Sequence, residues 1–382
     1  MASEVRPFVA DYPPCPIGCP IDHHGLFLHT SQGSNPGADR DPETILRRLQ
    51  PNPGGIGYRE EGGSRVSSQD VRWRLHDEPN LTNTLRTVAD YGRPLQFGVS
   101  LAPAASDLKV ILDTVDRADG SLDLVGIQDH PYQRRFLDTM QLLGTVAEQT
   151  DRLRVFPDVA CLPLRPPAML ASQAASIDIM SGGRFELGLG AGAFWDAIVG
   201  MGGPRRSPGE ALAALEEAVA IIRLLWTGER GLRFDGEHYA ITGIHSGPVP
   251  VHDIEIWFGV YGPRACQLLG RVADGWIPSL GRSSLTELDS RHRMIDESAL
   301  EAGRDPADIR RLVNIGGVIT DGAIDGPWNG PVEQWVERLT DLTRNNGFDS
   351  FIFWPEDDPV DQVGRFSDVS GQVREAVAAE RG

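Results

Sequence analysis

From Leu95 onward, short apolar runs alternate with segments whose apolar residues recur at helical spacing. The runs have the length of strands, and this alternation limits the possible folds more than any other feature. The eight expected strands span 95–101, 122–127, 153–160, 184–190, 254–260, 274–279, 311–320 and 350–354. The eight expected helices span 107–118, 136–148, 167–180, 208–226, 263–272, 285–302, 331–345 and 359–379.

The ends of several expected helices are marked by particular residues. Ser106 is a good N-cap for the first of them. Pro167 suits the first turn of the third, where a missing N–H costs nothing. The fourth, Pro208 to Trp226, has the clearest helical spacing, and Gly228 follows it as a stop signal.

The order of these elements favours one architecture. Strands that alternate with helices imply right-handed βαβ units and a parallel sheet. Their apolar runs are continuous rather than alternating, which is typical of strands buried on both faces. An open doubly wound sheet would place a Gly-rich fingerprint after the first strand, but GVSLAPAAS (98–106) has none. Eight repeats in about 290 residues therefore predict an α/β fold, the (βα)8 or TIM barrel.

Two segments do not follow the repeat. GLRFDGEHYAITG (231–243) alternates around a central Asp235-Gly236, which predicts a β-hairpin insertion at about 229–253, after the fourth helix. The first 94 residues are rich in Gly, Pro and Arg. We expect residues 1–94 to form a loop-rich extension with short helices from Asp41 and Pro79, and residues 95–382 to form the barrel domain.

Composition restricts the partners of the protein. Lys and Arg number 36 against 54 Asp and Glu, a formal charge of −18, which disfavours nucleic acid and anionic membranes. No apolar run reaches the roughly 18 residues that a membrane span needs. The start, MASEVRPFVADYPPC, lacks the apolar centre of a signal peptide. We expect a cytoplasmic protein that acts on a small molecule, with neither nucleic acid nor membrane as a partner.

Polar residues follow the second expected strand. In a (βα)8 barrel the active site lies at the carboxyl ends of the strands, and here the run LDLVGI ends in Gln128, Asp129 and His130. Histidine changes its protonation nearest neutral pH, and an adjacent carboxylate would raise its pKa and orient its ring. The alternative is that Asp129 caps a turn and His130 is an ordinary loop residue. We predict that both face the barrel mouth.

Glycines follow the fourth and fifth strands. Gly188, Gly190 and Gly192 would let the backbone approach a ligand closely. Gly262-Pro263 opens a helix, whose free N–H groups favour phosphate, and Arg264 could add a bidentate contact. Together they suggest a large, planar, phosphorylated ligand. Phe194, Trp195 and Tyr261 could pack on its rings.

A metal centre fits poorly. Hydrolase barrels with metals usually carry His-x-His at the end of the first strand, where this chain has GVSL. The run from Cys15 through Cys19 to His23 and His24 has an unsuitable spacing among prolines, so we interpret it as a Pro-rich arm. No metal ligands are predicted.

Four stretches are recognisable: GIQDHPYQ, LPLRPPAMLASQAASIDIMSGGRFELGLGAGAFWD, YGPRACQLLGRVADGWIPSL and EAGRDPADI. Through them the chain, from Leu95 to about Ser370, resembles the bacterial luciferase-like flavin-dependent oxidoreductases. Within these it is most similar to the branch that uses the deazaflavin coenzyme F420.

The resemblance implies a cofactor and its binding residues. Coenzyme F420, or alternatively FMN, would lie at the barrel mouth, with Asp129 and His130 as an acid/base pair. A non-prolyl cis peptide at Asp158-Val159 would press on one face of the ring, and the hairpin would form a variable region over the substrate. The implied cofactor-binding residues are Ser100, Gln128, Asp158, Val159, Ala160, Gly190, Ala191, Gly192, Ala193, Tyr261, Gly262, Pro263 and Arg264.

The chain also departs from that branch. Its sugar-phosphate dehydrogenases carry a glutamate as a second acid/base after the G-x-G turn, where this sequence has Ala193. The leading function is hydride transfer between coenzyme F420 and a small organic substrate. The alternatives are a monooxygenase that uses reduced FMN supplied by a separate reductase, and a barrel that binds flavin without turnover. The resemblance also implies a homodimer.

Overall fold

The computed structural model describes residues 90–245, 247–322 and 326–382, which belong to one compact unit. The helices expected from Asp41 and Pro79, and the Cys15–His24 run, lie outside the described residues. Within the described ranges, no helix is long and apolar enough to cross a membrane.

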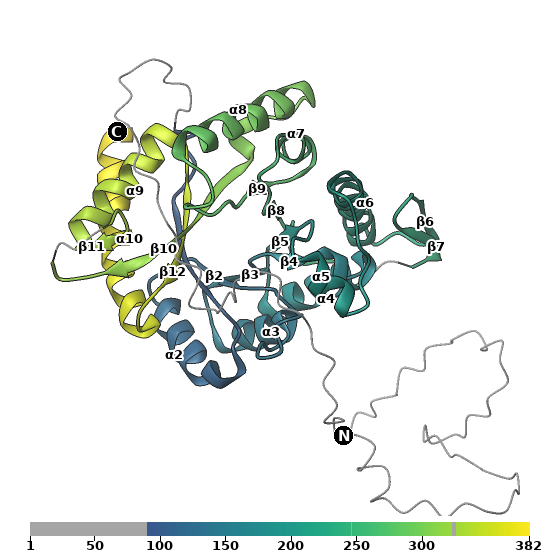
Figure 1. Ribbon diagram of the computed structural model, residues 1–382, viewed down its shortest axis with the longest axis horizontal. Coiled ribbons are helices and arrows are strands. Elements are labelled where there is room, and N and C mark those ends of the chain that lie inside the picture. The colour runs from purple at the N-terminus through teal and green to yellow at the C-terminus, as the bar shows by residue number, and fades with distance from the viewer. Residues whose placement is uncertain (1–89, 246, 323–325) are drawn as a thin grey trace, which may run out of the picture. The chain divides into compact units, whose positions relative to one another are not determined.

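Parallel strands form a nearly closed barrel surrounded by helices, as predicted (Figure 1). The barrel strands are β1 (Gln96–Leu101), β2 (Leu124–Ile127), β3 (Arg154–Pro157), β4 (Ala160–Cys161), β5 (Leu187–Gly190), β8 (Ile256–Phe258), β9 (Gly275–Trp276), β10 (Arg310–Ile319) and β12 (Ser350–Pro355). In Figure 1 the helices follow one another counterclockwise. Because βαβ crossovers are right-handed, this view looks onto the carboxyl ends of the strands.

The third predicted strand is divided into β3 and β4. β3 pairs with β2, whereas β4 pairs with β5, so the divided strand joins the two ends of the sheet. An isolated bridge between Val155 and Phe185 adds a contact at the same seam. The Asp158–Val159 peptide between the two halves is cis, as the resemblance implied.

The helices largely match the expected ranges. They are α2 (Leu108–Asp119), α3 (Thr139–Gln149), α4 (Pro167–Ser181), α5 (Trp195–Gly200), α6 (Pro208–Trp226), α7 (Pro263–Val272), α8 (Leu285–Glu301), α9 (Val332–Asn346) and α10 (Pro359–Arg381). α6 has the predicted bounds, and Ser207 and Glu210 form a capping box at its start. The short α5 and the strand β11 (Asn329–Gly330), which pairs with β10, were not predicted.

The predicted N-cap of the first helix was wrong. Ser106 lies inside a 3-10 turn, Ala105–Asp107, and Asp107 precedes α2 without a capping bond from its side chain. The backbone N–H of Ala105 donates to the carbonyl of Arg135, 2.8 Å away. This hydrogen bond holds the chain at Ala105, and the 3-10 turn that starts there precedes α2.

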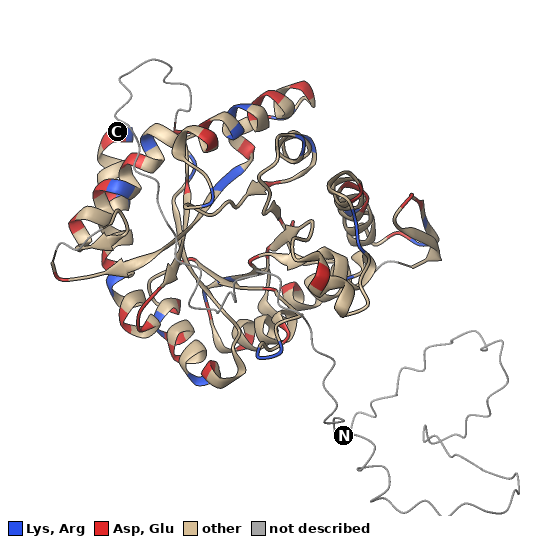
Figure 2. Cartoon of the chain, viewed as in Figure 1, with Lys and Arg blue, Asp and Glu red and all other residues tan. Residues whose placement is uncertain are grey.

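Apolar side chains fill two layers. The inner layer, inside the barrel, consists of Leu124, Phe156, Trp257, Ile277, Leu312 and Ile352, with Val159 packed against it. The outer layer lies between the strands and the helices and is much larger. Acidic and basic residues are interspersed along the outer helices (Figure 2). The barrel is therefore a filled core, and a ligand must bind above it.

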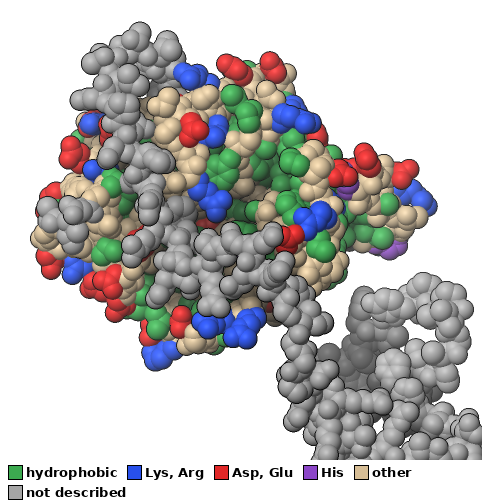
Figure 3. All heavy atoms as spheres, viewed as in Figure 1, with side chains coloured by type: hydrophobic (Ala, Val, Ile, Leu, Met, Phe, Trp, Pro, Cys, Tyr) green, Lys and Arg blue, Asp and Glu red, His purple; other side chains and the backbone are tan. Residues whose placement is uncertain are grey.

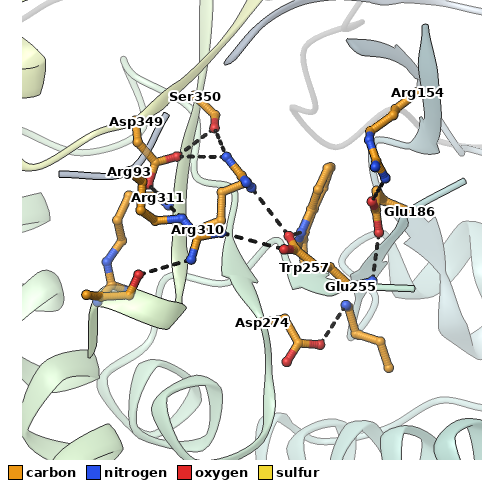
Figure 4. Close-up of polar contacts among 12 residues, drawn as sticks. Arg93, Arg154, Glu186, Glu255, Trp257, Asp274, Arg310, Arg311, Asp349 and Ser350 are labelled. Carbon is orange, nitrogen blue, oxygen red and sulfur yellow. Dashed lines mark hydrogen bonds and ion pairs between the residues drawn. The ribbon is translucent and has the colours of Figure 1, made fainter. Parts of the chain in front are cut away.

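Ion pairs hold the amino ends of the strands together (Figure 4). Arg310 at the start of β10 contacts Glu255 at 3.3 Å and Asp349 at 3.4 Å. Glu186, before β5, pairs with Arg154 and accepts the backbone N–H of Glu255 at 2.7 Å. Such a network at the end opposite the barrel mouth contributes to stability rather than to catalysis.

The predicted hairpin is present. β6 (Leu232–Asp235) and β7 (Ala240–Ile244) form a separate antiparallel sheet. Glu217 of α6 accepts the backbone N–H groups of Glu237, His238 and Tyr239 at 2.8, 3.0 and 2.9 Å. The carboxylate thereby fastens the turn of the hairpin to α6.

Candidate active site at the barrel mouth

The residues predicted from the second strand lie at the barrel mouth. β2 ends at Ile127, and the N–H of Gln128 still donates to the carbonyl of Leu101 at 3.0 Å. The Thr139 hydroxyl, in the first turn of α3, donates to the carbonyl of Gln128 at 2.7 Å. These bonds set the direction in which the next two residues leave the strand. From this side, Figure 3 shows hydrophobic side chains around a hollow in the middle of the barrel.

Asp129 is engaged by an arginine rather than by His130. Its oxygens accept bonds from Arg165 Nε at 2.7 Å and Arg165 Nη2 at 2.8 Å, and Oδ2 also accepts the N–H of Cys161 at 2.8 Å. Both partners of the pair are at least nine-tenths buried. Asp138, the N-cap of α3, binds the same guanidinium at 2.7 Å. Asp129 therefore holds the loop in place, and the expectation that it orients the His130 ring was wrong.

His130 is oriented by aromatic neighbours instead. Its Nδ1 is paired with the hydroxyl of Tyr132, and its ring lies edge-on to Phe194 with centroids 5.4 Å apart. Burial lowers the pKa of His130, and the Arg282 guanidinium lowers it further. The Asp129 carboxylate raises the pKa of His130, as expected, but burial outweighs this effect. The imidazole is therefore neutral at pH 7 and can accept a proton.

Polar side chains form a layer directly above the apolar interior. Asn314 of β10 donates from Nδ2 to Asp158 Oδ1 at 3.1 Å and accepts the Trp354 indole N–H at 2.9 Å. Ser100, near the end of β1, is 1 % exposed and Asp158 is 8 % exposed. Neither Ser100 Oγ nor Asp158 Oδ2 has a hydrogen-bond partner of normal geometry among the described residues. Two buried oxygens are thus left for a ligand or water to satisfy.

Asp158 has an unusual ionisation. Burial raises the pKa of this carboxyl to about 6, although Asn314, Ser100 and Trp354 each act to lower it. A carboxyl with this pKa exists in both its acid and its carboxylate form near neutral pH. Groups of this kind are frequent at functional sites.

Val159 projects over the interior, and two glycines make room for it. A Cβ on Gly190 would lie 2.9 Å from Val159 Cγ2, and one on Gly259 would lie 2.9 Å from the same atom. These glycines thus face the chain's own valine. The cofactor contact expected at Gly190 stays a prediction, and its backbone and those of Ala191, Gly192 and Ala193 continue along the rim after β5.

The predicted phosphate cradle lies at the start of α7. Gly262 is the N-cap and has no side-chain capping bond, and Pro263 and Arg264 are exposed. The Tyr261 hydroxyl accepts the N–H of Ser279 at 2.8 Å, which fixes the ring beside this helix start. The Arg282 guanidinium lies 6.0 Å from the centroid of the same ring. Two arginines and free backbone N–H groups suit an anionic group.

Three residues of the site were missed in the sequence: Tyr132, Arg165 and Arg282. Tyr132 and Arg165 stand inside recognised stretches, GIQDHPYQ and LPLRPP, but neither stands at a strand end. The only sequence signal for Arg165 was its position among apolar residues and prolines, because a charged side chain that is buried there needs a partner. No group of three or more potential metal ligands occurs within the described ranges.

Comparison with known proteins identifies the family of the chain. The model of the family described as luciferase-like monooxygenase matches residues 95–323, more than half of the chain. An F420-dependent glucose-6-phosphate dehydrogenase of Gordonia bronchialis is 28 % identical over 58 % of this chain and 68 % of its own. The enzyme of that name in Nocardia farcinica is 31 % identical over 45 % of this chain and 52 % of its own, about half its length.

A solved structure supports the fold. An F420-dependent secondary alcohol dehydrogenase, determined with an F420–acetone adduct, superimposes with a TM-score of 0.66 at 18 % identity. The superposition covers 74 % of this chain and 99 % of the other. The barrel, the divided third strand and the family match lead to the same conclusion: this chain belongs to the luciferase-like monooxygenase family.

Proposed function

We propose that the protein is an oxidoreductase that transfers a hydride between coenzyme F420 and a small organic substrate at the barrel mouth. The observation that carries the proposal is the placement of His130 at the barrel mouth, directly after β2 and held by Tyr132 and Phe194. The names of the two dehydrogenases and of the alcohol dehydrogenase structure support the choice of cofactor.

The residues at the mouth fit a large, flat, anionic cofactor. Val159 offers an apolar surface for one face of a ring, and the unpartnered oxygens of Ser100 and Asp158 offer hydrogen bonds to its edge. The start of α7 and Arg264 suit its phosphate. When bound, the deazaflavin supplies a carbon, C5, that accepts or donates a hydride.

His130 moves the proton that accompanies the hydride. As a neutral base, it takes the hydroxyl proton of an alcohol substrate while the hydride leaves the carbon, and it returns that proton in the reverse reaction. Tyr132 holds Nδ1, which leaves Nε2 as the nitrogen that faces the substrate. The rings of Tyr132 and Phe194 pack edge-on against the imidazole.

The substrate we favour is a small organic molecule other than a sugar phosphate. In the sugar-phosphate dehydrogenases of the branch a glutamate follows the G-x-G turn. Here the equivalent Ala193 is exposed and has no group that could exchange a proton.

Titration of the purified protein with oxidised F420, and separately with FMN, tests this proposal. We expect saturable binding of F420, followed by calorimetry, and at least ten times weaker binding of FMN. Tight binding of FMN alone would overturn the proposal in favour of the monooxygenase, because reduced flavin, unlike the deazaflavin, reacts with oxygen.

A further inference from the structure

A buried carboxyl stands in the barrel mouth with an oxygen that nothing in the described chain satisfies. Asp158 is 8 % exposed, and its Oδ2 has no hydrogen-bond partner. Only its Oδ1 is engaged, by the amide of Asn314 at 3.1 Å. No ion pair with Asp158 is found among the described residues.

Burial favours a proton on Asp158, and the hydrogen bonds of its neighbours only partly offset this effect. The groups around it are the Asn314 amide, the Ser100 hydroxyl and the Trp354 indole, all uncharged. Asn314 is itself fixed, because its Oδ1 accepts the Trp354 N–H at 2.9 Å and its backbone N–H donates to the Pro278 carbonyl at 2.8 Å. With its amide oxygen occupied, Asn314 can offer Asp158 only a donor. Oδ2, which has no partner, is left as the oxygen that carries the proton.

Hydride transfer requires two proton movements, and His130 accounts for one of them. An alcohol that loses a hydride also loses its hydroxyl proton, which His130 accepts. A deazaflavin that accepted the hydride would also need a proton on a ring nitrogen, and a residue of the protein would have to supply it. Ala193 cannot supply that proton, because its side chain has no ionisable group.

We propose that Asp158 is a second catalytic acid/base, which gives the cofactor ring its proton as the hydride arrives and removes it in the reverse reaction. In the forward step the O–H bond at Oδ2 breaks, an N–H bond forms on the ring, and Asp158 becomes a carboxylate. Water then reprotonates Asp158, and His130 releases the substrate proton to water. The assignment rests on the function proposed above.

The ionisation of Asp158 must then be linked to cofactor binding. The acid form donates a hydrogen bond to the oxidised ring, whereas the carboxylate repels an acceptor. Binding should weaken as the pH rises through the Asp158 pKa, because only the acid form binds well. The near-isosteric Asp158→Asn variant keeps an N–H donor but cannot ionise, so it should lose this pH dependence.

The experiment measures the Kd of oxidised F420 by calorimetry at pH 5.5, 6.5 and 7.5 for the full-length wild type, D158N and D196N. Asp196 is an exposed carboxylate on α5 and serves as the matched control. Ionisation of the free cofactor changes the measured Kd of all three proteins by the same factor. From pH 6.5 to pH 7.5, we expect the affinity for F420 to fall about tenfold more in the wild type and D196N than in D158N. D158N should also lose about 100-fold in turnover with a substrate that the wild type oxidises.

The outcomes separate the two proposals. If D158N and the wild type share one pH dependence, the assignment of Asp158 is overturned while cofactor use stands. If the wild type binds no F420 at any pH, the proposed function fails and the assignment fails with it. Should D158N not fold by circular dichroism, infrared difference spectra of the wild type replace it. Loss or shift of a protonated carboxyl band on F420 binding supports the assignment, and an unchanged spectrum overturns it.

Discussion

Replacing Arg165 with alanine is expected to lower the free energy of unfolding by about 3–5 kcal/mol. The guanidinium binds both oxygens of Asp129 and is 8 % exposed, and Asp129 is 3 % exposed. Removing one partner of such a pair leaves a buried, uncompensated carboxylate. The loop that carries His130 would lose its anchor at the same time, so activity should fall as well.

Chemical denaturation of matched variants measures this effect. Arg205→Ala removes an arginine whose pair with Asp196 is largely exposed, and it should cost less than about 1 kcal/mol. In the double variant Asp129→Asn/Arg165→Met the uncompensated charge is absent, so it should be more stable than Arg165→Ala alone. Equal destabilisation by Arg165→Ala and Arg205→Ala would show that the buried pair does not anchor the loop.

Replacing His130 with alanine is expected to lower kcat by about 10²- to 10⁴-fold while the Kd for F420 changes only a few-fold. The imidazole is the base for the substrate proton, whereas Val159 and the start of α7 supply most of the cofactor contacts. Because burial lowers the pKa of His130 below its usual 6.5, the neutral base persists to lower pH. The acid limb of the kcat profile should therefore lie below pH 6.5 in the wild type.

Steady-state kinetics and calorimetry on the same preparations separate these quantities. His245→Ala, at an exposed position after the hairpin, is the control and should leave both kcat and Kd unchanged. A His130→Ala variant that no longer binds F420 would assign the residue to binding. A variant that keeps full turnover would remove it from the mechanism.

The order of elements was readable from the sequence because it depends on local patterns. α6 has the predicted bounds, since Ser207 and Pro208 fix its start. The hairpin was also predicted, because alternation around Asp235-Gly236 is a short-range signal. α5 was missed because six residues carry too little periodicity to distinguish a helix from a loop.

The hydrogen bonds and ion pairs of the site could not be predicted from the sequence in the same way. Asp129 and His130 are adjacent in the sequence, which suggested a pair, but Arg165, thirty-six residues later, takes the carboxylate. Contacts between loops of neighbouring strands leave no local pattern. The pKa of His130 also depends on burial, which outweighs the charge of Asp129. Burial at a barrel mouth is a property of the folded chain and cannot be seen in the sequence.

The recognisable segment DIMSGGRFELGLG owes part of its pattern to packing. Arg184 donates to the carbonyls of Ala147, Thr150 and Leu153, which joins the end of α4 to α3 and to the residue before β3. Gly182 and Gly183 have positive φ angles of 69° and 91° at the turn after α4. Part of the recognisable pattern thus belongs to packing at the amino end of the barrel, whereas the chemistry lies at the opposite end.

The most direct test of the account is a crystal structure of the protein with oxidised F420 bound. We predict the deazaflavin ring against Val159, with Asp158 Oδ2 in hydrogen-bonding distance of its edge, the phosphate at the start of α7, and His130 beside C5. A ring bound away from Val159, or one with His130 on the far side of the mouth from C5, would contradict the central claim.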